Sequence, residues 1–453
     1  MFSPGRVWYD GWFAVPTRFT AARNAVSPVM TENRLMFNFI SIFHTVAGSL
    51  DFLTLLGLAG VQRRCWKLTI VAFWATACLL CAVCFNPYRH GIFTLVALTL
   101  WIHLPVLLLG TAVIRFMRQR CSRDSGSTNT RGSVEKPLRR ALTVAMVVVA
   151  IGILGVGFYA NRMEPYRLET TEKNFRSAKI RERRRIVVVS DLHIAHVGDY
   201  ERTVFQRIAE LEPDIVVLDG DIFQPMLDDV FVNHGFRVRQ DFRRTLLWRQ
   251  TVAEEFRSAW TEAKISPELG TWVVQGNHDQ IWGVTPSIPG VVWLQRTLTI
   301  PLGSDLLMTF LSANDSRDAD LNTNYADIAG THPTSRFRLM VGHHPDPAEN
   351  RTLTGEIADL FIAGHTHGGQ LQIPGLWPLI RRVFNSPTFW MAGEMKSVGG
   401  VPTYVTCGTG LAGLDSPRFR LNCRPEILLL TLEPENAVTT DGDFVSHARE
   451  DGK

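Results

Sequence analysis

In the C-terminal half of this chain one pattern recurs five times: a short apolar run is followed directly by polar residues of the kinds that bind metals. The apolar runs cover residues 186–190, 215–218, 271–274, 337–341 and 359–363. The polar residues that follow them are Asp191 and His193, then Asp221, then Asn277, His278 and Asp279, then His343, and finally His365 and His367. In α/β sheets the ligand site lies in the crevice beyond the carboxyl ends of the strands. The pattern therefore predicts an α/β fold in which these side chains gather at one edge.

Each polar cluster has an ordinary explanation on its own, because Gly-Asp and Gly-Asn sequences are typical of turns and helix caps. Their recurrence in one order at successive strand ends favours a shared site instead. Imidazole and carboxylate donors without a thiolate suit divalent Mn, Fe, Zn or similar ions and argue against a structural zinc site. Two such ions about 3.5–4 Å apart can stabilise both the attacking and the leaving oxygen of an in-line displacement. Asp221 is the natural bridging ligand, because a carboxylate has two oxygens.

The motif series D-x-H, G-D, G-N-H-D, H-x-P and G-H-x-H resembles the calcineurin-like metallophosphoesterase superfamily over residues 186–435. The resemblance implies a four-layer αββα sandwich with two divalent metal ions as cofactors. The residues that it assigns to the first ion are Asp191, His193, Asp221 and His367. The residues that it assigns to the second ion are Asp221, Asn277, His343 and His365. His343 is preferred over His344 because it matches the first position of the H-x-P motif.

The resemblance also implies two catalytic residues. His278 would face the substrate, where it stabilises the phosphate or protonates the leaving oxygen, and Asp279 would support that histidine. Residues 364–374 and 420–426 are similar to the membrane-tethered branch of the superfamily, which includes transmembrane metallophosphoesterases and UDP-2,3-diacylglucosamine hydrolases. Purple acid phosphatases carry a tyrosine three residues after the bridging aspartate, whereas this chain has Gln224. An Fe(III)–tyrosinate centre is therefore not expected.

The N-terminal third is much more apolar than the rest and contains four runs with the roughly 20-residue length that a membrane-spanning helix needs. The expected organisation is an N-terminal segment (1–34), a multispan region of four transmembrane helices (35–160), a charged linker (161–185), a metallophosphoesterase domain (186–435) and a disordered tail (436–453). The four expected spans cover 35–60, 68–85, 91–114 and 141–160. Asp51 interrupts the first span. An ionisable residue there is a functional candidate, with helix packing as the alternative.

Loop charge predicts the orientation of this integral, multi-pass membrane protein. Loops 61–67 and 115–140 are rich in Lys and Arg, whereas loop 86–90 on the opposite side carries only Arg89. This distribution puts the basic loops in the cytoplasm and the catalytic domain outside it. Residues 161–180 oppose the assignment, because they contain five Lys and Arg residues.

A net charge of +4 and the lack of any nucleic-acid-binding motif exclude nucleic acid as an expected partner. The expected partners are the membrane and a phosphorylated substrate, with lipid-linked substrates among the candidates. The arginine-rich stretch 237–249 is either an ordinary amphipathic surface helix or a basic lid that meets the membrane or an anionic headgroup. Residues 376–384 are a second candidate for such a lid. Cys407 and Cys423 are expected to be buried thiols, with a disulfide as the alternative.

Together with the resemblance, these features predict a membrane-anchored, metal-dependent hydrolase of phosphoester or phosphoanhydride bonds. A lipid such as UDP-2,3-diacylglucosamine is one candidate substrate, although the predicted outward orientation argues against a nucleotide-linked precursor on the cytoplasmic face. Two alternatives stay open. One is a phosphodiesterase or phosphatase of soluble nucleotides, and the other is a degenerate, non-catalytic membrane scaffold.

Overall fold

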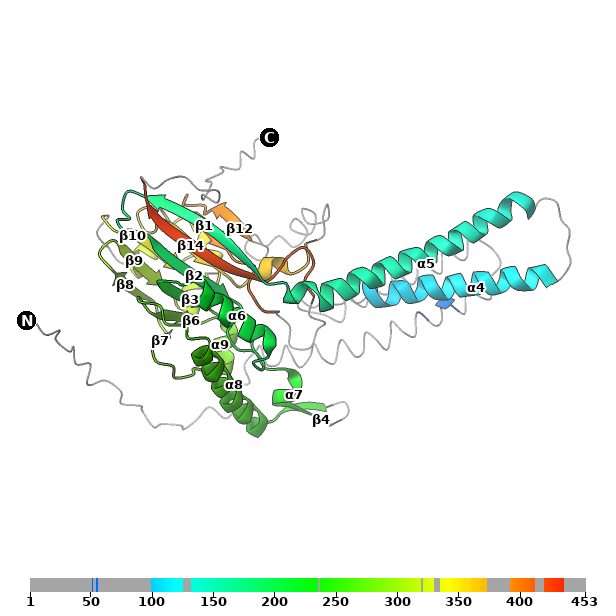
Figure 1. Cartoon of the computed structure of the whole chain (residues 1–453), viewed down its shortest axis with the longest axis horizontal. Coiled ribbons are helices and arrows are strands. Elements are labelled where there is room, and N and C mark those ends of the chain that lie inside the picture. The colour runs from blue at the N-terminus through cyan, green and yellow to red at the C-terminus, as the bar shows by residue number, and fades with distance from the viewer. Residues whose placement is uncertain are drawn as a thin grey trace, which may run out of the picture.

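Two long helices extend from one end of a β-sandwich in the computed structural model (Figure 1). Helix α4 spans Leu104–Asp124 and follows a π-helical turn, η1, at Thr99–His103, while α5 spans Gly132–Arg162. The residues that the structure describes are 51, 54–55, 99–124, 132–234, 237–318, 321–329, 335–372, 392–411 and 419–435. The two helices pack along each other, yet many of their large apolar side chains stay exposed on the outside. Such a surface suits lipid better than water.

Two segments qualify as membrane spans by length and composition alone, Thr99–Met117 and Pro137–Tyr166. They overlap the third and fourth spans predicted from the sequence. The first two predicted spans lie outside the described residues, apart from residues 51, 54 and 55. The arrangement of four spans therefore stays a prediction.

Asp51 is buried against the helix pair. Its Oδ2 lies 2.6 Å from Nδ1 of His103, which belongs to the π-helical turn before α4. A hydrogen bond of this kind joins neighbouring helices in a membrane. The contact favours the helix-packing explanation of Asp51.

The sandwich consists of two mixed six-stranded sheets. The first sheet has the order β1 (Glu169–Ser177), β14 (Glu426–Pro434), β2 (Arg184–Ser190), β3 (Ile215–Asp219), β6 (Thr271–Val274) and β7 (Val291–Leu294). The second sheet has the order β12 (Gly393–Lys396), β13 (Pro402–Val405), β11 (Leu360–Ala363), β10 (Phe337–Val341), β9 (Leu306–Phe310) and β8 (Leu298–Leu302). In each sheet the central strands run parallel, so their carboxyl ends meet at one edge. The five apolar runs predicted as strands are all strands of these sheets.

The main core lies between the two sheets and follows from the alternation of side chains along each strand. In β2, Ile186 and Val188 face the second sheet, while Val187 and Val189 face the helices on the other side. Helices α6 (Asp199–Glu210) and α8 (Phe242–Glu262) cover that outer face. Among the described residues, the outer face of the second sheet is covered by loops and short helices, including α11 (Tyr325–Ala329). The α/β sandwich prediction is confirmed, with a full helical layer described on one side.

The linker predicted at 161–185 is wrong for most of its length. Its residues 169–177 form β1, which pairs with β14 along nine residues at the edge of the first sheet. The charged side chains of this segment suggested a linker, but they also suit an edge strand, whose residues are partly exposed. The strand forms by pairing with β14. The folded domain therefore begins before residue 186.

The edge that carries the predicted metal ligands, called the metal-ligand edge below, lies at the end of the sandwich where α5 joins it. Strand β1 starts shortly after α5 and runs parallel to β14, whereas β2 runs antiparallel to β14, so β2 ends where β1 begins. Two hydrogen bonds fix this end: Arg420 N donates to Ala160 O (2.8 Å) and Cys423 N donates to Glu164 Oε1 (2.8 Å). The carboxyl ends of the ligand-bearing strands thus face the two long helices (Figure 1).

Candidate metal centre

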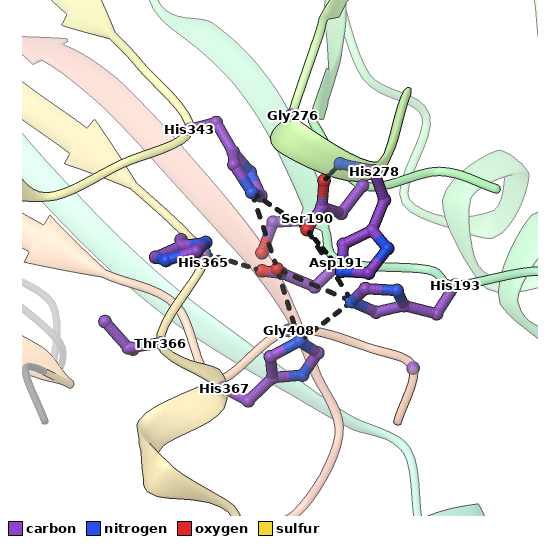
Figure 2. Close-up of polar contacts among 12 residues, drawn as sticks. Ser190, Asp191, His193, Gly276, His278, His343, His365, Thr366, His367 and Gly408 are labelled. Atoms are coloured by element: carbon purple, nitrogen blue, oxygen red, sulfur yellow. Dashed lines mark hydrogen bonds and ion pairs between the residues drawn. The ribbon is translucent and has the colours of Figure 1, made fainter. Parts of the chain in front are cut away.

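The strand-end side chains gather at one place. Asp191 and His193 follow β2, Asp221 follows β3, and Asn277 and His278 begin the short helix α9 (Asn277–Trp282) after β6. His343 follows β10, and His365 and His367 follow β11. Figure 2 shows the rings of His193, His343 and His367 turned toward Asp191 from separate loops. Asp191 and His367 are 176 residues apart in the sequence. Their loops meet because both follow strands whose carboxyl ends lie at the same edge of the sandwich.

Asp221 lies between several imidazoles. Its Oδ2 is 3.2 Å from His343 Nε2, 3.9 Å from His193 Nε2 and 4.0 Å from His278 Nε2. Its Oδ1 accepts a hydrogen bond from the His278 backbone N–H at 2.8 Å. One carboxylate oxygen is thus held in place while the other faces three rings.

A second set of close contacts centres on Asp191. His193 Nε2 and His367 Nε2 are 2.9 Å apart, and Asp191 Oδ1 is 3.4 Å from His367 Nε2. Ligand atoms bound to one ion at about 2.0–2.1 Å are spaced at about this distance. Asp191 Oδ1 and Asn277 Oδ1 are buried and have no hydrogen-bond partner among the described residues. Because buried polar atoms are almost always satisfied, this donor set fits divalent metal ions.

The backbone holds one imidazole in the orientation that a metal needs. His343 Nδ1 lies 2.8 Å from the carbonyl oxygen of Asp219, so we assign the proton to Nδ1. The other ring nitrogen, Nε2, faces Asp221 and is the one that would bind a metal ion. Such support fixes the tautomer and orientation of metal-binding histidines.

The site is built on strained backbone. The residues with positive φ include Asp191 (54°), His193 (47°), Asp221 (51°), His365 (67°) and His367 (50°). Left-handed backbone at a residue with a side chain costs on the order of 1–3 kcal/mol and persists only where the surroundings impose it. A Cβ on Gly276 would lie 2.1 Å from Asp221 Oδ1, and one on Gly220 (φ 76°) would lie 2.3 Å from His343 Nδ1. The close approach of these loops therefore requires glycine at both positions.

Burial and charge shift the acids of the site in opposite directions. Burial raises the pKa of Asp191 to about 6 and that of Asp219 to about 7, although His343 acts against both shifts. Burial also acts to raise the pKa of Asp221, but attraction to His343 and His278 lowers it well below its usual value. Burial acts to lower the pKa of His343, but Asp221 and its neighbours raise it well above the usual value. Several buried acids that share few positive partners form an environment that a cation stabilises.

Asp279 has a structural position in this site. Its Oδ2 accepts a hydrogen bond from Gly276 N (2.9 Å), and its Oδ1 accepts hydrogen bonds from Ile222 N (2.9 Å) and Phe223 N (3.3 Å). It thereby ties the loop after β6 to the loop after β3. The sequence assigned Asp279 to support of the histidine, and these contacts support it through the backbone that carries both His278 and Asp221.

Sequence reasoning missed the loop that packs behind Asp191. Gly410 N donates to Asp191 O at 2.7 Å, and a Cβ on Gly408 would lie 2.8 Å from Asp191 Cβ. The fully buried guanidinium of Arg420 donates to Gly408 O (3.0 Å) and Gly410 O (2.6 Å). The only sequence signal was the Gly-Thr-Gly triplet at 408–410. Arg420 is therefore a positioning residue for this part of the site.

Both soluble-half cysteines are thiols as predicted, but only Cys423 is buried, whereas Cys407 is partly exposed. Cys407 and Cys423 are free, and Cys423 Sγ donates to His367 O at 3.2 Å. The Cys423 backbone N–H donates to Oε1 of Glu164, two residues beyond the end of α5. This connects the loop of His367 directly to the helix end.

Adding Mn(II), Fe(II) or Zn(II) to metal-free protein is expected to raise the midpoint of thermal unfolding. An ion that binds only the folded state at 100 times its Kd stabilises it by about 2.7 kcal/mol. For a domain of this size that corresponds to roughly 5–10 °C. Differential scanning fluorimetry with and without a chelator checks this. A midpoint that none of the ions moves would contradict metal binding here.

Residues 184–369 match the family model described as calcineurin-like phosphoesterase. The chain is 28% identical over 326 residues to the uncharacterized metallophosphoesterase YkuE of Bacillus subtilis, a match that covers 67% of this chain and 100% of that protein. It is 25% identical over 402 residues to a transmembrane protein with metallophosphoesterase domain of Bos taurus, covering 81% and 80%. It is 22% identical over 293 residues to the UDP-2,3-diacylglucosamine pyrophosphatase LpxG of Chlamydia trachomatis, covering 52% and 80%. The resemblance seen in the motifs, including its membrane-tethered branch, is confirmed.

Proposed function

We propose that this member of the calcineurin-like phosphoesterase family, a hydrolase of phosphoester bonds, acts at a membrane with two divalent metal ions. Its proposed substrate is a lipid-linked phosphoester or pyrophosphate. The observation that carries the proposal is the position of the metal-ligand edge, which lies at the end of the sandwich joined to α5.

We assign Asp191, His193, Asp221 and His367 to the first ion, and Asp221, Asn277, His343 and His365 to the second. The 2.9 Å spacing of His193 and His367 and the orphaned Asp191 Oδ1 support the first set. The orphaned Asn277 Oδ1 and the 3.2 Å approach of His343 to Asp221 support the second. Asp221 is the shared ligand, since its Oδ2 faces histidines of both sets.

When bound, the ions act as Lewis acids that polarise the phosphoryl group and supply a nucleophile at neutral pH. The chain's own residues orient this chemistry. His278 approaches the Asp221 carboxylate from the partly exposed side of the site, since its side chain keeps 19% of its surface open whereas that of His343 keeps none. It is therefore placed to meet substrate and to donate a proton to the leaving oxygen. Asp279 and Arg420 hold the loops on which these groups depend.

A membrane location is supported by two apolar helices and by relatives named as transmembrane proteins. Loop charge favours an extracytoplasmic position for the catalytic domain, with several spans before it. The relative named as a UDP-2,3-diacylglucosamine pyrophosphatase supports a lipid-linked phosphate as substrate class. A fusion of a compartment-dependent reporter to the C-terminus tests the orientation.

The decisive experiment is a hydrolysis panel with full-length protein in lipid nanodiscs, supplied with Mn, Fe, Zn or Mg. The substrates are a nitrophenyl phosphodiester, a nitrophenyl monoester, a nucleotide diphosphate sugar, a phospholipid and UDP-2,3-diacylglucosamine. We expect metal-dependent hydrolysis, with kcat/KM for a lipid-linked substrate at least about tenfold above that for soluble ones, a difference of about 1.4 kcal/mol. Preference for the soluble nucleotide would favour a nucleotide phosphodiesterase, and no hydrolysis with any ion would favour a binding protein.

A further inference from the structure

We propose that the first two turns of α8 form a membrane-contact surface that rests on the headgroup region of the bilayer crossed by α4 and α5. This contact surface consists of Phe242, Arg243, Arg244, Leu246 and Leu247. The inference rests on the proposed membrane location and adds to it: the catalytic domain would be held against the bilayer at a second point, with the metal-ligand edge beside it.

The contact surface is unusually apolar for an exposed helix end. Phe242 is 77% exposed, Leu247 64% and Leu246 46%, although Thr245 and Trp248 in the same turns are buried. C-terminal to Tyr166, the other exposed large apolar residues of the described part are Val292, Leu321 and Val398, which are far apart in sequence. Residues four apart on a helix lie on one face, so Phe242 and Leu246 form one patch. Three such side chains in six positions indicate a surface that is covered in use.

The charge of this helix end points to an anionic partner. Arg243 and Arg244 are exposed and occupy the first turn of α8, which contains no acidic residue. The N-terminus of a helix carries a partial positive charge, so basic residues there are unfavourable for the helix itself. The Asp241 carboxylate at the N-cap already accepts hydrogen bonds from the backbone N–H groups of Arg243 and Arg244, so it is the exposed arginine side chains that would attract a negatively charged headgroup layer. Apolar side chains mixed with arginine on one helix are typical of a helix that lies in a membrane interface.

The contact surface lies at the same end of the molecule as the metal-ligand edge. Trp248 Nε1 donates to Ala195 O at 2.7 Å, and Ala195 is two residues beyond His193. The segment before α8 contains α7 (Leu227–Val230) and the hairpin of β4 (Phe231–His234) and β5 (Arg237–Gln240), and it projects from the sandwich in the direction in which α4 and α5 extend (Figure 1). Asp241, the N-cap of α8, hydrogen-bonds to Val230 of this segment through its backbone. A bilayer around the long helices would therefore meet this side of the domain.

This placement selects the bilayer over a soluble partner or a second copy. Hydrogen bonds connect the site to both elements: Cys423 joins the His367 loop to Glu164 beyond α5, and Trp248 of α8 donates to Ala195 beyond His193. In this arrangement the phosphate of a lipid headgroup would reach the proposed metal ligands while the lipid stays in the membrane. Of the two explanations that the sequence left open for residues 237–249, this is the membrane-facing one. The second candidate, 376–384, lies outside the described residues.

The test that does not depend on activity is photocrosslinking. Full-length protein carrying benzoylphenylalanine at position 247 is reconstituted into nanodiscs of phosphatidylcholine, with or without phosphatidylglycerol, and irradiated. A second protein carries the crosslinker at position 292, which is exposed but on a strand of the first sheet. We expect phospholipid adducts at 247 that exceed those at 292 at least about fivefold and rise with phosphatidylglycerol. Equal adducts at both positions, or adducts between two copies of the chain, would overturn the proposal.

The companion test is kinetic. The double variant Phe242→Ser, Leu247→Ser removes exposed apolar surface and leaves the buried face of α8 intact, so it should fold. It is expected to lower kcat/KM for a lipid substrate in nanodiscs by roughly tenfold and to leave hydrolysis of a soluble nitrophenyl diester unchanged. The control Val292→Ser should alter neither. Lipid adducts at 247 without any lipid hydrolysis would retain the contact surface while rejecting the proposed substrate, and an unaffected lipid rate in the double variant would count against the contact surface.

Discussion

Replacing Asp221 with asparagine is expected to remove nearly all hydrolytic activity and to lower the bound metal content. Asp221 Oδ2 faces His343, His193 and His278 at 3.2–4.0 Å, and the proposed assignment makes Asp221 the carboxylate common to both ion sites. Asparagine keeps the size of the side chain but replaces a charged oxygen donor with a neutral amide. Loss of a residue that merely supports a metal ligand typically costs about 10–100-fold. Loss of a shared ligand should exceed that, so we expect kcat/KM to fall by more than about 100-fold.

Kinetics with a nitrophenyl diester and elemental analysis of the purified variant check this prediction. Asp199→Asn is the matched control, because Asp199 is an exposed carboxylate in the first turn of α6, away from the ligand set. It should retain both activity and metal. Retention of activity in the Asp221 variant would argue that Asp221 is not a metal ligand and would revive the non-catalytic scaffold.

The metal-ligand edge could be predicted from sequence because parallel strands impose it. Residues 215–218 are wholly apolar and 337–341 are apolar apart from Arg338, and such short runs are typical of strands buried on both faces. Once such strands lie parallel, residues directly after them must converge, even where they are far apart in sequence. Asp221 and His343 meet for this reason, at 3.2 Å.

The supporting contacts could not be predicted in the same way. Arg420 would ordinarily be assigned to the surface, yet it is fully buried because four backbone carbonyls of its neighbourhood accept its N–H groups. Likewise β1 has the composition of a linker and becomes a strand only because β14, from the other end of the chain, pairs with it. Both features depend on tertiary contacts, which leave no periodic pattern of apolar residues in the sequence.

The same contacts, which the sequence did not predict, connect α5 to the proposed metal site. Glu164, two residues beyond α5, accepts a hydrogen bond from the Cys423 backbone, and the Cys423 thiol donates to the carbonyl of His367. Arg420 connects the backbone of Ala160 in α5 to the loop behind Asp191. Two of the ligands proposed for the first ion are thus braced against the helix that is proposed to cross the membrane. The resemblance alone predicts the ligands but says nothing of this bracing.

His278→Ala is expected to separate proton donation from metal binding. His278 reaches Asp221 Oδ2 only at 4.0 Å and lies on the partly exposed side of the site, so its loss should leave the metal content unchanged. A positioned general acid contributes about 10²–10⁴-fold. We therefore expect kcat to fall within that range for a substrate with an alkyl or lipid leaving group. For a nitrophenyl substrate the fall should be much smaller, because nitrophenolate is stable enough to leave without a proton.

His196→Ala provides the matched control, since His196 is an exposed histidine near the site loops whose partner is Asp229, at 3.1 Å. It should leave both rates unchanged. The comparison requires kcat for alkyl and nitrophenyl esters of the same phosphate under one set of metal conditions. Equal losses for both leaving groups in the His278 variant would reject proton donation and assign this histidine to stabilisation of the phosphate charge instead, because that interaction is the same whichever group departs.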